Sequence, residues 1–263
     1  MKLSMVSSCF YKPFRENGMT MIDVIKVAKE IFDIDMVEMV HWMTYANTNP
    51  ENVNTRENMD NIKEALNKYG VAVLNMCIDV GNISQLDKGK RREDIEKIKE
   101  WIDWAAYLGS RAARPHAGFQ PEGMLDLNIT VDSFKELCDY AGEKGLNVLM
   151  ENFDGVASDP DNMIEIFERV NRPNFKIIAD FDNFPAEIRY QGLDKIFDLD
   201  IHSVHVKTFE FDEQGEQIKY DFSKCIEIVK KHNYRGYMSV EYEGQGNSIE
   251  GIKKTIALLK KYM

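Results

Sequence analysis

The fold of this chain is decided by segments such as "IHSVHVKTFE", residues 201–210. Ile201, Val204 and Val206 are apolar residues typical of a buried β-strand. His205 and Lys207 alternate with the two valines, so they belong to the opposite face of that strand. An imidazole and an ammonium group inside a sheet need polar partners, because burying them alone is costly. The segment therefore predicts a buried strand that ends in a polar site.

Seven more segments along the chain have the same apolar character and are expected to be strands. They are "LSMVS" (3–7), "DMVEMV" (35–40), "VAVLNMCI" (71–78), "RAARPHAG" (111–118), "LNVLMEN" (146–152), "FKIIADF" (175–181) and "GYMSVEYE" (236–243). Amphipathic helical patterns follow them, with apolar residues at i, i+3 and i+4. The clearest of these patterns cover 95–106, 131–141 and 249–259. Helix starts are expected at Thr20, Asn247 and the pair Asp159-Pro160.

Eight strand–helix units in 263 residues are the number expected for a (β/α)8 barrel, here a single domain over residues 1–263. A doubly wound open sheet is the competing α/β architecture, and it usually has a glycine-rich first turn. The first turn here, "SSCFYKPF" (7–14), has no glycine cluster. A long polar loop is expected over 41–56, and no linker rich in proline, glycine or serine divides the chain.

Composition narrows the classes of partner. Of the residues, 44% are hydrophobic and 29% are charged, which is typical of a globular protein. The net charge of −11 disfavours nucleic acid and leaves no basic patch for a membrane surface. The four cysteines, Cys9, Cys77, Cys138 and Cys225, have neither metal-ligand nor redox spacing. With no signal-peptide core or membrane span at the start, the sequence predicts a cytoplasmic protein.

The last four strands place ionisable residues on one face. Apolar residues of one parity should meet the helices, so the other parity points into the barrel. By this rule the inward residues at the carboxyl ends of the strands are Glu151, Asp180, His205 with Lys207, and Glu241 with Glu243. Three carboxylates and an imidazole at one height would repel each other without a counter-charge. A divalent cation would resolve this, and the oxygen-rich set favours Mn²⁺ or Mg²⁺, with Co²⁺ or Zn²⁺ as alternatives.

A metal-free arrangement is the alternative for the same residues. Lys207 could neutralise Glu241 or Glu243, and Arg114 could pair with the other acids, in a barrel whose charges are purely structural. His202 has the opposite parity to His205 and lies earlier in the strand, so a hydrogen-bonded core histidine is expected there.

Four motifs resemble those of a known family. They are "VLMEN" (148–152), "IIADFDN" (177–183), "SVHVKT" (203–208) and "SVEYEG" (239–244). Together they resemble the xylose isomerase-like (β/α)8 barrels, a sugar isomerase and epimerase group that includes ketose 3-epimerases, hydroxypyruvate isomerase and inosose dehydratase. The resemblance covers essentially the whole chain. It implies one divalent metal ion held by Glu151, Asp180, His205 and Glu241, with Glu151 and Glu241 also acting as the acid/base pair.

The chain departs from the family at two of these positions. It has Asn183 where the family often has a histidine and Thr208 where the family often has an aspartate. Asp182 is a rival to Asp180 as a ligand, but strand parity favours Asp180.

Several further residues are candidates for contact with a substrate. Lys207 and Asn183 belong to the motifs, and Glu38, Arg114 and His116 end upstream strands, where a salt bridge or loop packing is the alternative role. Trp42, together with His41 and Phe10, is expected to form an aromatic wall for a sugar or to pack loops.

The resemblance implies proton transfer next to a carbonyl through an enediolate, on a small sugar or polyol. Isomerisation and epimerisation use this chemistry, and so does dehydration of an inosose-type keto-polyol.

A non-catalytic sugar-binding barrel is the alternative from another functional class. A DNA-repair endonuclease of the same barrel type is disfavoured, because its site is richer in histidine and this chain has five histidines in all. An unphosphorylated substrate is favoured, because the sequence has no P-loop and no dense basic cluster. Whether the protein forms a homo-oligomer is left open by the sequence.

Overall fold

The computed structural model describes residues 2–45 and 54–263. Eight parallel strands close into a barrel in the order β1 to β8, with β1 paired to β8. The strands are β1 Lys2–Val6, β2 Met36–Val40, β3 Ala72–Ile78, β4 Ala112–Pro115, β5 Asn147–Glu151, β6 Phe175–Asp180, β7 Ile201–Thr208 and β8 Tyr237–Tyr242. The predicted (β/α)8 barrel is thereby confirmed.

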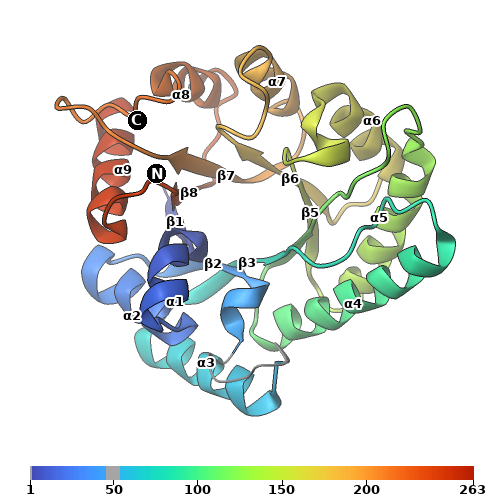
Figure 1. Ribbon diagram of the computed structural model, residues 1–263, viewed down its shortest axis with the longest axis horizontal. Helices are drawn as coiled ribbons and strands as arrows, with labels where there is room; N and C mark the ends of the chain where they lie inside the picture. The colour runs from blue at the N-terminus through green and yellow to red at the C-terminus, as the bar shows by residue number, and fades with distance from the viewer. Residues whose placement is uncertain (1, 46–53) are drawn as a thin grey trace.

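Helices surround the barrel on all sides, and the first and last strands meet near its centre-left in Figure 1. The α-helices are α1 Tyr11–Asn17, α2 Met21–Phe32, α3 Arg56–Tyr69, α4 Lys88–Tyr107, α5 Leu127–Gly142, α6 Pro160–Val170, α7 Arg189–Ile196, α8 Phe222–Lys231 and α9 Ser248–Tyr262. Short 3₁₀ turns follow three of the strands: η1 Ser7–Phe10, η2 His41–Thr44 and η3 Gly155–Ser158. Most of the polar loop expected over 41–56 lies outside the described residues. No helix in the described ranges combines the length and the hydropathy that a membrane span requires.

Helix starts agree with the capping signals in the sequence. The Thr20 side chain accepts from the Asp23 N–H while the Asp23 carboxylate accepts from the Thr20 N–H, so a full capping box begins α2. Asn247 caps α9, and Asp159 caps α6 with Pro160 in the first turn. The sequence predicts these helix starts correctly because the capping residue and its hydrogen-bond partner lie within a few residues of each other in the chain.

The strand β4 is shorter than its apolar segment predicts. It ends at Pro115, whereas the pattern extends to Gly118. Gly118 has φ +87, a left-handed conformation outside the β region, and a Cβ there would lie 2.1 Å from Asn82 Oδ1. The chain therefore leaves the sheet before Gly118.

The helix α9 also differs in detail from its pattern. Ile249 and Ile256 are only half-buried, and the buried face includes the small residues Gly251 and Thr255. Thr255 Oγ1 lies 2.6 Å from Thr208 Oγ1 on β7, and the Tyr242 ring fills the space beside Gly251. Small residues thus let α9 approach the barrel closely, which the spacing of its larger apolar residues does not reveal.

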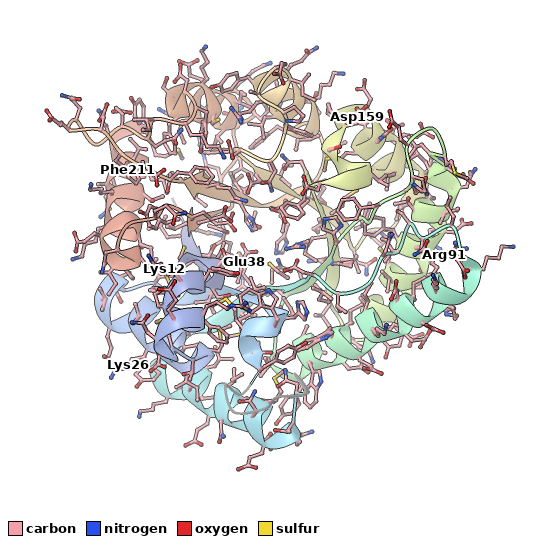
Figure 2. All side chains as sticks on the ribbon, in the orientation of Figure 1. Lys12, Lys26, Glu38, Arg91, Asp159 and Phe211 are labelled. Atoms are coloured by element: carbon pink, nitrogen blue, oxygen red, sulfur yellow. The ribbon has the colours of Figure 1, made fainter. Side chains whose placement is uncertain are left out.

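The barrel interior is arranged in layers along its axis. Ala112, Leu149 and Ile178 form a small apolar cluster inside the barrel, separate from the large core between strands and helices. Toward the carboxyl ends of the strands the interior becomes polar, and Figure 2 shows Glu38 within the ring of strands while Lys26 and Arg91 lie at the periphery. A packed base below a polar mouth is the arrangement that positions a site in this type of barrel.

Candidate active site

The His205 ring lies at the centre of a group of buried carboxylates at the barrel mouth. Its Nδ1 atom is 3.1 Å from Glu151 Oε1, 3.5 Å from Glu241 Oε2 and 3.9 Å from Asp180 Oδ2. These three acids come from the ends of β5, β8 and β6, and all four side chains are less than 10% exposed. The structure therefore brings together four of the six ionisable residues that strand parity places inside the barrel.

Three atoms of this group make no hydrogen bond within the described part of the chain. They are Asp180 Oδ2, His205 Nδ1 and Glu241 Oε2, all of them buried. One ligand atom from each of Glu151, Asp180 and His205 lies within 4.8 Å of the others. Ligand atoms this close to one another could hold one ion between them. The donor set and its unsatisfied atoms fit a divalent cation.

Each acid is held through its other atoms. The second oxygen of Glu151 lies 3.1 Å from Arg114 Nε, and Glu241 Oε1 accepts a 2.9 Å hydrogen bond from the Ser8 hydroxyl. Asp180 Oδ1 accepts from two backbone N–H groups of the turn that follows β6, at 2.7 and 3.0 Å. The carboxylates are therefore oriented before anything binds, with their remaining oxygens turned toward His205.

Lys207 adds a positive charge on the outer side of the group. Its Nζ is 3.2 Å from Asp180 Oδ2, 3.4 Å from Glu241 Oε2 and 3.5 Å from Glu243 Oε1. It also donates to Asn183 Oδ1 at 3.0 Å, and Asn183 Nδ2 in turn donates to Glu151. The pairing expected for a metal-free barrel thus exists here, alongside a donor set that suits a metal.

The electrostatic environment shifts the pKa of these groups strongly. Burial alone would lower the pKa of His205, but the carboxylates of Glu38, Glu151 and Glu241 outweigh it and hold that pKa well above its usual value. Burial and the two site glutamates raise the pKa of Asp180 well above the usual range, although the neighbouring ammonium group opposes them. A bound cation would favour the deprotonated forms of both groups, so metal binding here would be coupled to proton release.

A cavity of about 130 Å³ opens directly above the His205 ring. Its lining includes the ionisable side chains of Asp79, Arg114, Glu151, His205, Lys207, Glu241 and Glu243 together with Ser8, Cys77, Val6, Val40, Trp42 and Phe153. Phe153 lies below two cations: its ring centroid is 6.0 Å from the Arg114 guanidinium and 5.9 Å from Lys207 Nζ. The cavity therefore combines an aromatic wall with charged donors and acceptors.

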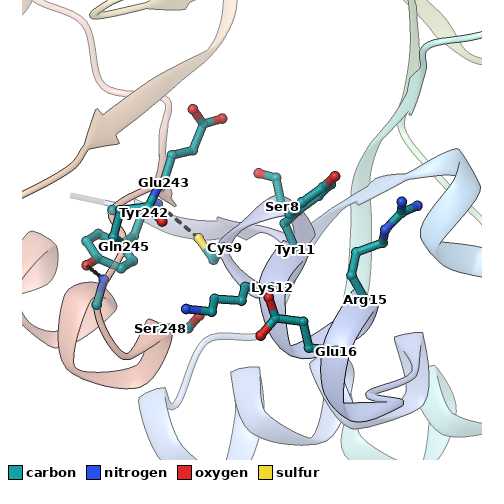
Figure 3. A pocket seen from close by; sticks show the side chains of 12 residues that line it. Ser8, Cys9, Tyr11, Lys12, Arg15, Glu16, Tyr242, Glu243, Gln245 and Ser248 are labelled. Carbon is teal, nitrogen blue, oxygen red and sulfur yellow. Dashed lines mark hydrogen bonds between the residues drawn. The ribbon is translucent and has the colours of Figure 1, made fainter.

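A second cavity, of about 470 Å³, adjoins the first between α1 and the loop after β8 (Figure 3). Ser8 and Glu243 line both, so they form the boundary between the two spaces. Tyr11, Lys12 and Gln245 are among the residues of the larger cavity. Small-molecule pockets usually measure about 300–1,000 Å³, so the smaller cavity alone is below that range and the pair together is within it.

The other sequence candidates occupy different places. Trp42 lines the cavity and packs edge-on against Tyr11 and Phe14. Glu38 does not line it; it lies fully buried with its Oε2 atom 3.1 Å from His205 Nε2. His116 stacks on the Phe119 ring and accepts from the Gly118 N–H.

The remaining candidates belong to the surroundings of the site. Asp182 pairs with Arg189 and Lys219, away from the His205 group. His41 accepts from the Asp79 N–H through Nδ1, and Phe10 is buried in the core. Burial lowers the pKa of His202, which is half-buried, and its Nε2 atom makes no hydrogen bond within the described residues.

Three further residues of the site were not predicted from the sequence, because polar residues were sought at the carboxyl ends of only some strands. Ser8 follows β1 and Asp79 follows β3, where Asp79 Oδ1 accepts a 2.7 Å bond from Arg114. Asn152 follows Glu151 and clamps the backbone of Asp180 with two hydrogen bonds, of 2.7 and 3.0 Å. The first two could have been found by extending the same argument to every strand, whereas the partner of Asn152 depends on the pairing of β5 with β6.

Comparison with known proteins agrees with this architecture. The model of the xylose isomerase-like TIM barrel family matches residues 25–262. A putative hydroxypyruvate isomerase of Xenopus laevis is 22% identical over 212 residues, which cover 72% of this chain and 77% of that protein. The crystal structure of 3-keto-D-glucoside 4-epimerase, YcjR, from E. coli has a TM-score of 0.75 at 18% identity and covers 99% of each chain. The probable 3-DHS dehydratase AsbF of Bacillus anthracis has a TM-score of 0.73 at 17% identity, also over 99% of each chain. At these identities the structural likeness shows the fold alone, and the family match over nearly the whole chain shows that this protein belongs to the xylose isomerase-like TIM barrel family.

Proposed function

We propose that the chain is a divalent-metal-dependent sugar isomerase or epimerase that moves a proton at a carbon next to a carbonyl group. The observation that carries this proposal is the convergence of three carboxylates on His205 Nδ1 beside a cavity that His205, Glu151 and Glu241 line. The isomerase and the epimerase among the similar proteins support this class of reaction.

Glu151, Asp180, His205 and Glu241 are the residues that would hold the metal ion. Their three carboxylates and one imidazole favour Mn²⁺ or Mg²⁺, with Co²⁺ and Zn²⁺ as the other candidates. When bound, such an ion supplies Lewis-acid polarisation of a carbonyl oxygen, which makes the neighbouring C–H more acidic.

We assign the acid/base roles to Glu151 and Glu241. Both line the cavity, whereas Asp180 is fully buried and is not among the lining residues. Arg114 and Ser8 fix one oxygen of each glutamate, so each carboxylate keeps its position while it takes up or releases a proton. One glutamate removes the proton from carbon, and the other returns a proton to the same or the adjacent carbon. Return to the same carbon from the opposite face gives an epimer, and return to the adjacent carbon gives an isomer.

The remaining polar side chains of the site would bind the hydroxyl groups of a sugar. Lys207 and Arg114 face the cavity with donors, and Asn183 links Lys207 to Glu151. Trp42 offers a flat apolar surface of the kind that sugar rings contact. The part of the substrate distant from the reacting carbon would extend past Ser8 into the larger cavity of Figure 3.

Dehydration of a keto-polyol is the second candidate reaction. The same proton removal, followed by loss of a β-hydroxyl group, would give an unsaturated product. The likeness to the probable dehydratase AsbF supports this candidate.

We expect purified protein with Mn²⁺ to incorporate solvent deuterium into a ketose, an aldose or an inosose in D₂O. Mass spectrometry and NMR would identify the labelled carbon, and loss of water would identify a dehydratase. Glu241→Gln should lose exchange by a factor of at least about 10² while remaining folded, because a general base contributes roughly 10²–10⁴-fold. Exchange at the wild-type rate in Glu241→Gln, or after removal of the metal, would refute the proposal.

A further inference from the structure

Glu38 occupies a place that neither solvent nor a molecule in the cavity can reach. Its side chain is fully buried, and its residue is absent from the lining of both cavities at the mouth. Within residues 2–45 and 54–263 no lysine or arginine forms an ion pair with it; its ionic contact is the 3.1 Å approach of Oε2 to His205 Nε2. In the described part of the chain, the only charged neighbour that this carboxylate touches is therefore a candidate metal ligand.

Hydrogen bonds from two other strands fix the position of the Glu38 carboxylate. Asn75 on β3 donates to Oε2 at 2.9 Å, and the Ser239 hydroxyl on β8 donates to Oε1. Ser239 Oγ is in turn 2.6 Å from Ser4 Oγ on β1, and all of these side chains are fully buried. Both oxygens of Glu38 therefore accept a hydrogen bond, Oε2 from Asn75 and Oε1 from Ser239, and the carboxylate has a fixed direction.

The protonation of the His205 ring follows from this contact. Since Oε2 accepts from Asn75 and also lies 3.1 Å from His205 Nε2, it is the acceptor in this contact too, so the ring nitrogen that faces Glu38 carries the hydrogen atom. In a neutral imidazole the other nitrogen then has a free lone pair. That other nitrogen is Nδ1, which faces Glu151, Glu241 and Asp180.

We propose that Glu38 is a positioning residue: it holds the His205 ring in the Nε2–H tautomer, so that Nδ1 is presented to a divalent cation. This inference rests on the metal site of the proposed function. It replaces the role of substrate contact that the strand-end position of Glu38 suggests, because the side chain lies beneath the imidazole rather than beside the cavity. A carboxylate behind a ligating histidine orients the ring and increases its basicity, and losing it typically weakens metal binding about 10–100-fold.

Two substitutions separate the charge of Glu38 from its hydrogen bond. Glu38→Gln keeps an acceptor oxygen for His205 and Asn75, and its amide can donate to Ser239; we expect Mn²⁺ binding to weaken about 10-fold with the tautomer kept. Glu38→Leu removes the acceptor, and we expect a loss of about 100-fold or more. Isothermal titration calorimetry of the full chain with Mn²⁺, on protein shown to be folded by its unfolding transition, measures both values. Asp94→Asn is the control: it removes a carboxylate whose side chain is 20% exposed and which pairs with Lys97 away from the site, and its affinity should stay close to the wild-type value.

A spectroscopic measurement tests the tautomer independently of activity. Long-range ¹H–¹⁵N correlation of Zn²⁺-loaded protein labelled in histidine, with the signal assigned through His205→Gln, should show a proton on Nε2 and none on Nδ1. The Nε2 proton should exchange slowly in wild type and in Glu38→Gln, and rapidly in Glu38→Leu. A role in packing alone would lower the melting temperature of the variants and leave both the tautomer and the Mn²⁺ affinity of folded protein unchanged.

Failure of this inference can be told apart from failure of the proposed function. A proton on Nδ1 in the loaded protein, or wild-type Mn²⁺ affinity in Glu38→Leu, would overturn the role of Glu38 while leaving the metal site intact. Absence of any Mn²⁺ binding by the wild type would overturn the metal site and this inference together. Tight binding with the expected tautomer, but no deuterium exchange into any sugar, would support the role of Glu38 and count against the proposed reaction.

Discussion

Lys207 shows how a single residue balances a buried group of acids. Only 6% of its side chain is exposed, and its Nζ lies 3.2 Å from Asp180 Oδ2 and 3.4 Å from Glu241 Oε2. Removing one partner of a buried ion pair costs about 3–5 kcal/mol, because the charge that remains keeps its desolvation penalty. A bound cation would supply positive charge at the same carboxylates, so the importance of Lys207 should depend on the metal.

We therefore expect Lys207→Met to lower the free energy of unfolding by about 3–5 kcal/mol in metal-free protein and by less with saturating Mn²⁺. Urea titrations with EDTA and with Mn²⁺ measure the two values. Lys219→Met is the control, because Lys219 lies 2.6 Å from Asp182 but its side chain is 49% exposed, and such pairs contribute at most about 1 kcal/mol. Equal losses for Lys207→Met in both metal states would contradict the expectation.

At the scale of elements, the close approach of α9 to β8 depends on a residue without a side chain. A Cβ added to Gly251 would lie 2.3 Å from the Tyr242 ring, which is closer than real contacts allow. The glycine costs α9 some helix propensity, and its absence of a side chain is what lets the helix contact the barrel. Gly142 in α5 is the counterpart, since the nearest atom to an added Cβ there is Asn174 Nδ2 at 3.3 Å.

We expect Gly251→Ala to lower the free energy of unfolding by about 1–3 kcal/mol, because overpacking displaces the ring or the helix. Gly142→Ala should change the stability by less than about 1 kcal/mol in either direction, because alanine favours a helix whereas Asn174 Nδ2, which donates to the Cys138 and Leu146 carbonyls, must shift slightly. Equilibrium urea denaturation of the two variants provides the comparison. Wild-type stability in Gly251→Ala would show that the ring moves aside without cost.

At the scale of the whole molecule, burial of neutral histidines couples stability to pH. Burial lowers the pKa of His41 from its usual value near 6.5 to about 4, and burial also lowers the pKa of His116 and His202. Since the folded pKa of His41 lies below the unfolded value, the unfolded state binds more protons between these two values. The contribution of His41 to stability is therefore complete above about pH 6.5 and is lost as the pH falls toward 4.

We expect His41→Gln to reduce the slope of unfolding free energy against pH, between pH 6 and 5, by up to about 1.4 kcal/mol per pH unit. The glutamine can still accept from the Asp79 N–H, and the shifts of His205 and Asp180 cancel in the comparison because both proteins have them. Urea titrations at half-unit steps of pH measure the slopes. Parallel pH profiles for the two proteins would mean that His41 titrates alike in the folded and unfolded states.

The sequence alone determines the elements of this protein and the inward residues of its last four strands. Alternation along a strand has a fixed period of two, so the valines of 201–207 that face the helices place His205 and Lys207 in the barrel. Caps such as Thr20 with Asp23 are equally local, and they mark helix starts without knowledge of the rest of the chain. Local periodicity therefore suffices to assign the fold class and to place Glu151, Asp180, His205 and the pair Glu241 and Glu243 inside the barrel, whereas the choice of Glu241 as a ligand comes from the family resemblance.

Only the tertiary structure decided which distant residues meet these side chains. Glu38 and His205 are 167 positions apart on β2 and β7, strands that do not pair, so their contact exists only because the barrel closes and brings them across its interior. The hydrogen bond from Ser8 to Glu241 likewise requires β1 to lie beside β8. Strand parity gives the direction of a side chain, whereas its partner depends on barrel closure and register, which are set by packing over the whole chain.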